Sequence, residues 1–285
     1  MQYTQYSHAD KFLERMGDYF ERTEALNGLM FGICLQLKNE PFRYGEHQPL
    51  FAVVEEDGVI HLAALMTPPY KLQLCAPTGY AAQSIETLAH GLAANGWEVP
   101  AVIAEKHLAE SFVHVWDTHQ NCRHHEGMSQ RIHKLRHVQA VTYAHGEFRQ
   151  AEPQDIETVI AWMRAFHQDC FGNAEPDRAT HIAEQKVRNG ELFFWSDPAP
   201  VSMAGRTRPT PNGESIGPVY TPPEQRGQGY ATSVVAALSQ RLLDEGKQFC
   251  CLYTDLANPT SNSIYRKIGY VPVADVIDIH FDYWH

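Results

Sequence analysis

A glycine-rich turn in the second half of the sequence has the residue types that bind anionic groups. It lies in the segment 216–232, which predicts a strand, a turn and the start of a helix. Gly227 and Gly229 have no Cβ, so the turn can take positive φ values and a ligand can approach the backbone closely. The N–H groups that open the following helix point to the same place, where aligned peptide dipoles add roughly half a positive charge. A phosphate or pyrophosphate is therefore the expected ligand of this anion cradle, residues 227–232.

Two other glycine-rich nucleotide signatures fit these residues poorly. A P-loop requires Gly-Lys-Ser/Thr, and no such sequence follows the two glycines. The dinucleotide fingerprint fits Gly227 and Gly229, but Thr232 stands at its third position and no acidic residue lies near the expected ribose contact. A dinucleotide oxidoreductase therefore remains a rival reading, and it predicts binding of NAD.

The elements that follow the turn would hold the cradle in place. Apolar residues at helical spacing predict a helix that Gly246 ends; they are Ala231, Val234, Val235, Leu238 and Leu242. A continuous apolar run at 249–254 predicts a parallel strand that is covered on both faces. Asn258 can then cap a second helix with Pro259 at its first position and Gly269 just past its end.

These features together resemble the GNAT superfamily of acyl-CoA-dependent N-acyltransferases. Arg-Gly-Gln-Gly-Tyr-Ala at 226–231 is similar to the Arg/Gln-x-x-Gly-x-Gly/Ala pattern of that superfamily. The order strand, turn, helix, strand, helix is its cofactor-binding order. The spacing of Asn258, Tyr265, Gly269 and Tyr270 resembles its Asn-x(6)-Tyr-x(3)-Gly-aromatic ending. With the flanking strands, the resemblance covers residues 147–281.

The resemblance implies an enzyme that uses acetyl-CoA as acyl donor and acetylates a primary amine of a small molecule directly, with no acyl-enzyme and no metal. The pyrophosphate would lie on N–H groups of the cradle, and pantetheine would bond main chain of the preceding strand. The expected cofactor-binding residues are Val219, Tyr220, Thr221, Arg226, Gly227, Gln228, Gly229, Tyr230, Ala231, Thr232, Asn258 and Asn262. Pro218 cannot donate to a sheet ladder, so we expect this strand to bulge or splay there and admit the thioester.

Tyr265 is the predicted catalytic residue, a general acid that protonates the leaving thiolate. Asn258, Asn262 and Tyr265 are spaced four and three apart, hence on one helix face. The alternative is that the Tyr265 ring only packs and hydrogen-bonds. An N–H of Val219 or Tyr220 is the candidate donor to the tetrahedral oxyanion. The general base stays open between Glu214, Asp255 and a chain of water molecules.

An internal repeat predicts that the chain is a tandem duplication. Leu50-Phe51 precedes Val59 by the same interval as Leu192-Phe193 precedes Val201, and Gly79-Tyr80-Ala81 matches 229–231. The predicted fold is mixed α/β with two GNAT-like domains, 1–140 and 145–285. Each would have a mixed, mostly antiparallel sheet with a parallel central pair and flanking helices.

The first copy departs from the family pattern at the positions of the cradle. Ala76 stands where the second copy has Arg226, and Pro77, which lacks an N–H, stands where it has Gly227. We therefore expect the cofactor only in the second domain, and a structural or acceptor-cleft role for the first. About sixteen residues follow Gly269, so the last strand of the second domain is either missing or supplied by the other half.

Composition narrows the possible partners and compartment. A net charge of −11 argues against a nucleic-acid surface, and no apolar run approaches a membrane span. Six cysteines without a Cys-x-x-Cys pair favour a reducing, cytoplasmic compartment, and His-Glu-x-x-His is absent, so no metal is expected. A non-catalytic acyl-CoA-binding regulator is the main alternative function. The amine, the acyl length and the oligomeric state are left open.

Overall fold

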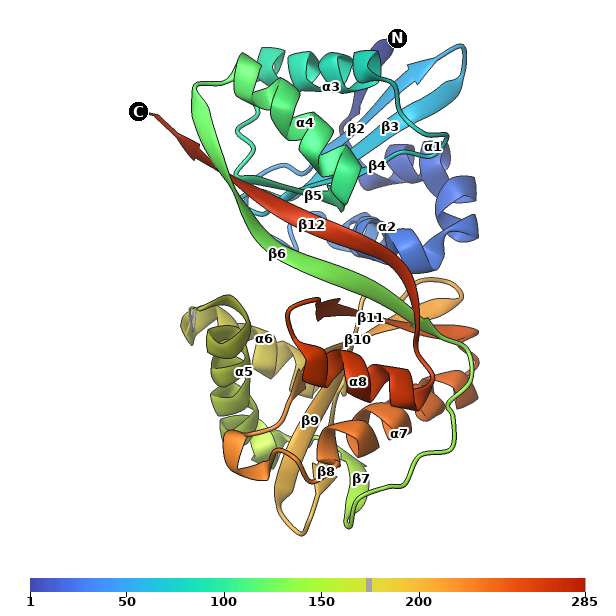
Figure 1. Cartoon of the computed structure of the whole chain (residues 1–285), viewed down its shortest axis with the longest axis vertical. Helices are drawn as coiled ribbons and strands as arrows, with labels where there is room; N and C mark the ends of the chain where they lie inside the picture. Colours follow the sequence, from blue (N-terminus) through green and yellow to red (C-terminus); the bar gives the residue numbers. More distant parts are fainter. Residues whose placement is uncertain (173–175, 285) are drawn as a thin grey trace. The chain divides into compact units, whose positions relative to one another are not determined.

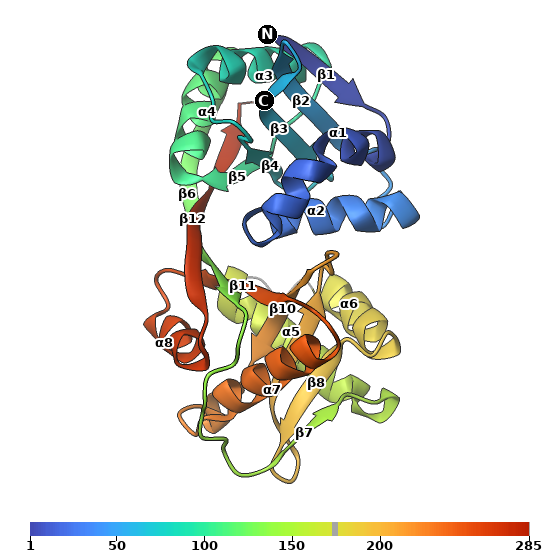
Figure 2. The same cartoon turned by 90° about the vertical axis from the view of Figure 1, so that its right-hand side faces the viewer.

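The computed structural model describes residues 1–172 and 176–284, and its contacts divide the chain into two compact units. The first unit comprises residues 1–132, 253–257 and the segment from 273 onward. The second unit comprises residues 133–252 and 258–272. Figures 1 and 2 show the two units, and each is described by itself below.

The same order of elements occurs twice along the chain, as expected of a duplicated sequence. The first pass is β1 (Gln2–Tyr6), α1 (Ala9–Arg22), α2 (Glu24–Asn39), β2 (Leu50–Glu56), β3 (Val59–Met66), β4 (Leu72–Cys75), α3 (Ala82–Ala94), β5 (Ala101–Glu105), α4 (Lys106–His119) and β6 (Cys122–Leu135). The second is β7 (Glu147–Gln150), α5 (Ile156–Phe171), α6 (Pro176–Arg188), β8 (Leu192–Ser196), β9 (Pro200–Thr207), β10 (Gly213–Tyr220), α7 (Tyr230–Asp244), β11 (Phe249–Asp255), α8 (Pro259–Ile268) and β12 (Val271–Tyr283). Short 3-10 turns precede α5 and α7.

The sheet of the first unit is covered on both faces by helices. Its strands run in the order β1-β2-β3-β4-β5-β12-β6, with β4 and β5 parallel. Along β2, Leu50, Ala52 and Val54 point to the α3–α4 side, whereas Phe51 and Val53 point to the α1–α2 side. Figure 2 shows the two helix pairs on opposite sides of the strands. A near-continuous apolar run such as 50–54 is what burial on both faces requires.

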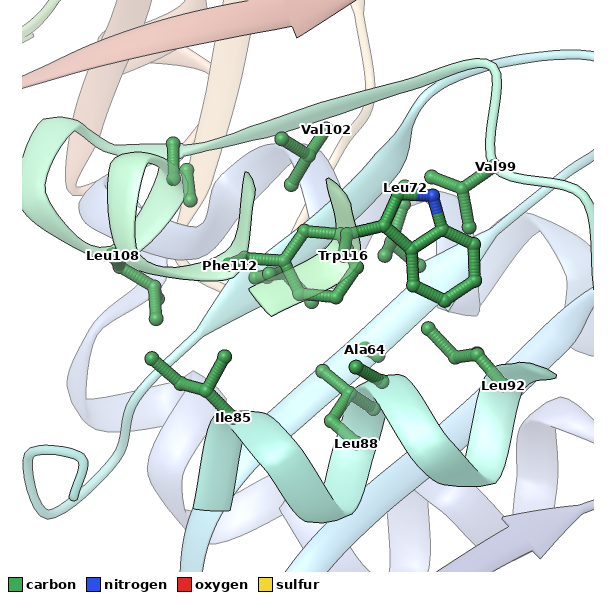
Figure 3. Close-up of a cluster of buried hydrophobic side chains, with 14 of the residues drawn as sticks. Ala64, Leu72, Ile85, Leu88, Leu92, Val99, Val102, Leu108, Phe112 and Trp116 are labelled. Carbon is green, nitrogen blue, oxygen red and sulfur yellow. The ribbon is translucent and has the colours of Figure 1, made fainter. Parts of the chain in front are cut away.

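Helical spacing builds the larger core of the first unit. Leu108, Phe112 and Trp116 lie one turn apart on α4, and they face Ile85 and Leu88 of α3 in the close-up of Figure 3. The Phe112 and Trp116 rings stack with centroids 5.5 Å apart. Both aromatic side chains are fully buried, so they fix how α4 packs on the sheet.

The second unit repeats this arrangement with its own two cores. Its strands run in the order β11-β10-β9-β8-β7, with the end of β6 beside β11, and β10 and β11 are parallel. Phe193 and Trp195 of β8 join the core with α7 and α8, while Leu192 and Phe194 join the core with α5 and α6. The predicted mixed α/β class is therefore confirmed, and each unit has one parallel pair among mostly antiparallel strands.

The final strand is present, and it lies in the sheet of the first unit. β12 is a single strand of 13 residues, and its residues 276–280 pair antiparallel with 101–105 of β5. Ile277 and Ile279 of this strand are buried in the same core as α3 and α4. The open question about the last strand of the second domain is thus answered: β6, from the first half of the sequence, is the neighbour of β11, and β12 joins the strands of the first unit.

The described residues contain neither a membrane-spanning helix nor a cluster of metal-binding side chains. No described helix is both long and apolar enough to cross a membrane. Across residues 1–172 and 176–284, no three histidine, cysteine, aspartate or glutamate side chains are grouped so that they could hold a metal ion. The expectations of no membrane and no metal stay predictions.

Candidate functional site

The anion cradle has the backbone conformation that its glycines predicted. Gly227 and Gly229 have φ values of +79° and +85°, and Gly229 is the N-cap residue of α7. The first backbone bond of this helix start runs from the Ser233 N–H to the Gly229 carbonyl, at 3.0 Å. The N–H groups of Tyr230, Ala231 and Thr232 come before it, where helix geometry gives them no intrahelical partner. The predicted positive φ values are confirmed, and the helix start presents donors to an anion.

The side chain of Tyr230 anchors the beginning of α7. Its ring is buried, and its hydroxyl donates to Asp197 Oδ2 at 3.0 Å. His145 Nδ1 lies 2.8 Å from the other oxygen of Asp197, and the bonds from His145 and Tyr230 lower the pKa of this carboxyl group. Any contact of Tyr230 with a ligand would therefore use its backbone. Sequence reasoning missed Asp197, which is 33 residues away from Tyr230.

The segment before β7 braces the same helix start from outside. The Ala144 N–H donates to Ser233 Oγ at 2.9 Å, and Ser233 Oγ donates to the Gly229 carbonyl at 3.1 Å. The Trp195 indole N–H donates to the His145 carbonyl at 2.9 Å. These bonds hold the cradle rigid before any ligand binds, which reduces the entropy lost on binding.

Arg226 links the turn to two other elements. Its guanidinium donates to Asp169 Oδ2 of α5 at 2.7 Å and to the Thr221 carbonyl at 2.9 Å. The guanidinium carbon also lies 5.9 Å from the centroid of the Tyr220 ring. The Thr221 carbonyl, a predicted pantetheine contact, therefore already accepts one hydrogen bond and has one lone pair left for a ligand.

β10 breaks where Pro218 predicted a bulge or splay. Its pairing with β9 shifts register between Ile216 and Val219. Its parallel pairing with β11 covers only Gly213–Ser215 against Phe249–Cys251. The predicted splay is therefore confirmed, and it lies directly before Val219 and Tyr220, the proposed oxyanion donors.

The helix α8 has the predicted start and end. Asn258 Oδ1 accepts from the Ser261 N–H at 3.0 Å, Pro259 is the first helical residue, and Gly269 ends the helix with φ of +112°. The Asn262 side chain donates to the Asn258 carbonyl at 2.8 Å. Capping thus explains Asn258 and in part Asn262, and their contact with a cofactor stays a prediction.

Tyr265 is a buried phenol beside the other predicted site elements. It belongs to one apolar core with Tyr230 of α7, and Val219 of β10 packs against that core. Its ring is 5.9 Å from the Tyr270 ring at 71°. Burial raises the pKa of Tyr265, and the nearby Cys170 of α5 raises it further. The phenol is therefore held protonated, the state that a general acid needs.

The predicted residues thus lie at the end of β10, in the turn, at the start of α7 and along α8. Gln228 is exposed, and its amide nitrogen lies 3.4 Å from Gln225 Oε1. Ala231 and Thr232 are half-buried in the first turn of α7. Tyr220 turns its ring toward α5, where it lies 6.0 Å from the Trp162 ring.

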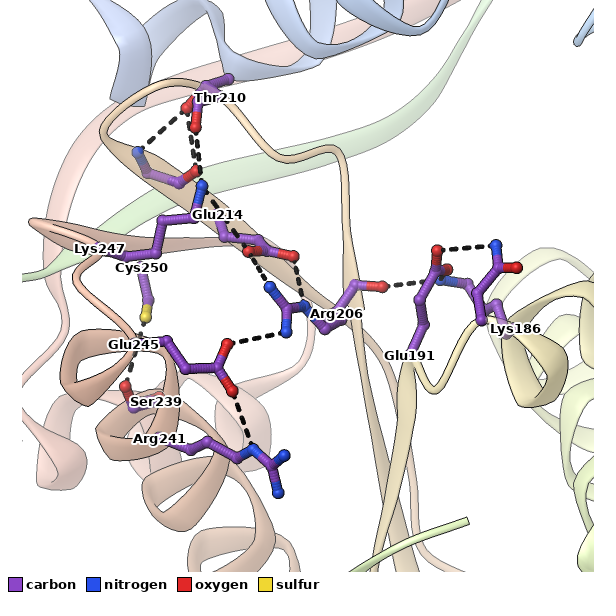
Figure 4. A network of polar contacts seen from close by, with 12 residues as sticks. Lys186, Glu191, Arg206, Thr210, Glu214, Ser239, Arg241, Glu245, Lys247 and Cys250 are labelled. Atoms are coloured by element: carbon purple, nitrogen blue, oxygen red, sulfur yellow. Dashed lines mark hydrogen bonds and ion pairs between the residues drawn. The ribbon is translucent and has the colours of Figure 1, made fainter. Parts of the chain in front are cut away.

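Glu214, one candidate base, is held in a polar network (Figure 4). Both of its oxygens accept from the Arg206 guanidinium at 2.7 Å, and its side chain is 3% exposed. Arg206 also donates to Glu245 at 2.9 Å. A carboxylate engaged in this way is suited to stabilising the fold and poorly suited to taking a proton from a ligand. Asp255, the second candidate, accepts from the Ala257 N–H at 2.8 Å.

The corresponding loop of the first unit has a different helix start. Gly79 has φ of +80°, similar to Gly229. However, α3 begins only at Ala82, with Ala81 as its N-cap residue, whereas α7 begins directly after its glycine. Together with Pro77 this moves the helix donors away from the glycine of the first copy.

A family model matches the part of the chain that carries these features. Residues 197–275 match the model described as FR47-like protein; this stretch runs from just before β9 into β12 and includes the cradle. No curated protein matches the chain.

Solved structures share the fold over nearly the whole chain. A Drosophila protein is 12% identical, with a TM-score of 0.67 and 98% of both chains covered. A GNAT-family acetyltransferase from Colwellia psychrerythraea is 11% identical, with a TM-score of 0.58 and coverage of 99% of this chain and 100% of that one. A tandem GNAT protein from the clavulanic acid biosynthesis pathway is 13% identical, with a TM-score of 0.58 and coverage of 99% and 98%. The chain therefore shares the fold of these GNAT proteins over nearly its whole length, and its segment 197–275 is similar to FR47-like proteins.

Proposed function

We propose that the second unit binds acetyl-CoA and transfers the acetyl group directly to a primary amine of a small molecule. The observation that carries this proposal is the anion cradle beside the break in β10. A diphosphate on the N–H groups of 229–232 would leave the pantetheine arm to run along the end of β10. The thioester would then reach the splay that opens after Ser215.

The proposed reaction needs three groups: a hydrogen-bond donor to the oxyanion, an acid that protonates the leaving sulfur, and an acceptor for the proton of the amine. The neutral amine attacks the thioester carbon, and the N–H of Val219 or Tyr220 stabilises the oxyanion. The tetrahedral intermediate then collapses: the C–S bond breaks, and Tyr265 donates its proton to the leaving sulfur. The proton lost by the amine passes to Asp255 or to a chain of water molecules. An acidic chain, with net charge −11, would attract a cationic amine before it is deprotonated.

One experiment separates this function from its alternatives. Calorimetry with CoA and with NAD tests the ligand, and thiol release from acetyl-CoA with a broad panel of primary amines tests turnover. Binding of CoA together with amine-dependent thiol release supports the proposal. Binding of CoA without release on any amine favours the regulatory module, and binding of NAD alone favours the oxidoreductase.

We expect Gly227→Ala to weaken CoA binding tenfold or more. A Cβ there would meet no atom within 4 Å, so the cost is backbone strain at φ of +79° and a methyl group in the ligand's path. Gly246→Ala is the matched control, because Gly246 has φ of +98° and equally open space at the other end of α7. Calorimetry should show the control unchanged. Equal loss in both variants would mean that strain alone explains the effect.

We expect Arg226→Ala to weaken CoA binding about five- to tenfold, as removal of one half-exposed charge-assisted contact does. The substitution also leaves Asp169 unpaired near the expected diphosphate. The loss of CoA affinity should be smaller at high salt, because salt screens both the attraction of Arg226 for the diphosphate and the repulsion by Asp169. Arg266→Ala, which removes an exposed arginine from α8, should leave CoA affinity unchanged. A similar loss in both variants would contradict a specific role for Arg226.

A further inference from the structure

A cavity of about 100 Å³ lies wholly within the first unit. It is bounded by α2, by the ends of β4 and β5, and by single residues of other elements, among them Tyr253 of β11 and Val276 of β12. No residue of the anion cradle lines it. The cavity is therefore separate from the site proposed for acetyl-CoA.

The cavity opens where two parallel strands part. The pairing of β4 with β5 covers Leu72 with Val102 and Gln73 with Ile103. Beyond that point, Cys75 and Glu105 continue the two strands and line the cavity. Crevices at the carboxyl ends of diverging parallel strands are where α/β sheets most often bind ligands.

Gln73 provides a buried acceptor that lacks a donor. The residue is 8% exposed and lines the cavity, and its Oε1 atom has no hydrogen-bond partner within residues 1–172 and 176–284. A buried carbonyl oxygen normally has at least one partner, and leaving it without one is unfavourable. A ligand that brings an N–H donor would satisfy this oxygen.

Glu105 provides a negative charge at the cavity. It is exposed at the end of β5, and among the residues that line the cavity it is the one aspartate, glutamate, histidine, lysine or arginine. Tyr19 and Tyr253 also line the cavity, and aromatic rings can attract a cation. The charge of the cavity therefore favours a cation over an anion.

The rest of the wall is apolar and sets the size of the ligand. It includes Leu26, Leu29, Met30, Leu74 and Leu108. A cavity of about 150 Å³ accommodates the six carbon atoms of benzene, so about 100 Å³ suits roughly four heavy atoms.

We propose that this cavity binds a small primary alkylammonium ion, with its ammonium group between Gln73 Oε1 and Glu105 and its short chain against the leucines. The site goes beyond the proposed acetyl transfer, because it lies in the copy that lacks the cradle. It gives the first unit a ligand of its own.

The test titrates the full chain with n-propylammonium, with 1-propanol as the neutral probe of equal size and with propionate as the anionic probe. Binding is followed by calorimetry and by ligand-observed NMR. Propylammonium should bind at least tenfold more tightly than propanol, and propionate more weakly still. Equal affinities of the three probes, or no binding of propylammonium, would overturn the proposal.

Two substitutions locate the site. Gln73→Leu and Glu105→Gln should each weaken propylammonium binding at least fivefold. Glu86→Gln is the matched control, since it removes one negative charge from the exposed face of α3 in the same unit. A propylammonium signal that survives both cavity substitutions belongs to another site, such as the amine site of the second unit, and contradicts this inference.

A measurement of the Tm shows whether the Gln73→Leu variant is folded. Leucine has a similar volume and no polar atom, so Gln73→Leu should keep or raise the Tm. A Tm well below that of the wild type would mean that the Gln73 amide already has partners, which would also overturn the proposal.

Discussion

Tyr265→Phe should lower acetyl-CoA turnover with an amine by about 10²–10⁴-fold, the usual contribution of a general acid. The physical reason is that the substitution removes only the proton that the leaving thiolate takes. Burial raises the pKa of this phenol, so it remains protonated throughout the pH range in which amines react. The CoA dissociation constant should stay within about twofold of the wild-type value, because the hydroxyl acts only in the transition state and does not help to bind CoA.

Tyr270→Phe is the control for this measurement. Tyr270 is buried nearby, and its hydroxyl shares a hydrogen bond of 2.9 Å with Ser239 inside the core of the second unit. We expect this variant to lose some stability and to keep its turnover. Unchanged turnover in Tyr265→Phe would leave Tyr265 with a packing role only.

Arg206→Met should reduce the free energy of unfolding of the second unit by about 3 kcal/mol, the cost of leaving a buried charge without its partner. The Glu214 side chain is 3% exposed, and both of its oxygens accept hydrogen bonds from Arg206. Lys247 lies 3.9 Å from Glu214 and compensates only in part. Urea denaturation measures the change, with probes in each unit because two units need not unfold together.

Two further variants test the origin of that loss. Arg206→Met combined with Glu214→Leu should recover most of the stability, because neither charge is then left in the interior. Arg131→Met breaks a bidentate pair with Asp275 in the first unit, but both side chains are at least one-third exposed. It should cost less than about 1 kcal/mol. A similar loss from both arginine variants would contradict the role assigned to burial.

The sequence alone determined the features that depend on neighbours in the chain. The positive φ values of Gly227 and Gly229 follow from a missing Cβ. The cap at Asn258 and the helix end at Gly269 follow from interactions over three or four residues. The break of β10 at Pro218 follows from a missing N–H. Each of these was predicted because its cause lies within one turn or one strand.

Only the tertiary structure decided which distant segments meet. The sequence could not say which sheet the roughly sixteen residues after Gly269 would join, and residues 276–280 among them pair with β5. Asp197, Asp169 and Arg206 gained their partners Tyr230, Arg226 and Glu214 through packing, from residues with no shared local pattern. The cavity at Gln73 likewise exists only where β4 and β5 part. Backbone preferences are local and readable from the sequence, whereas burial and pairing depend on the whole folded chain.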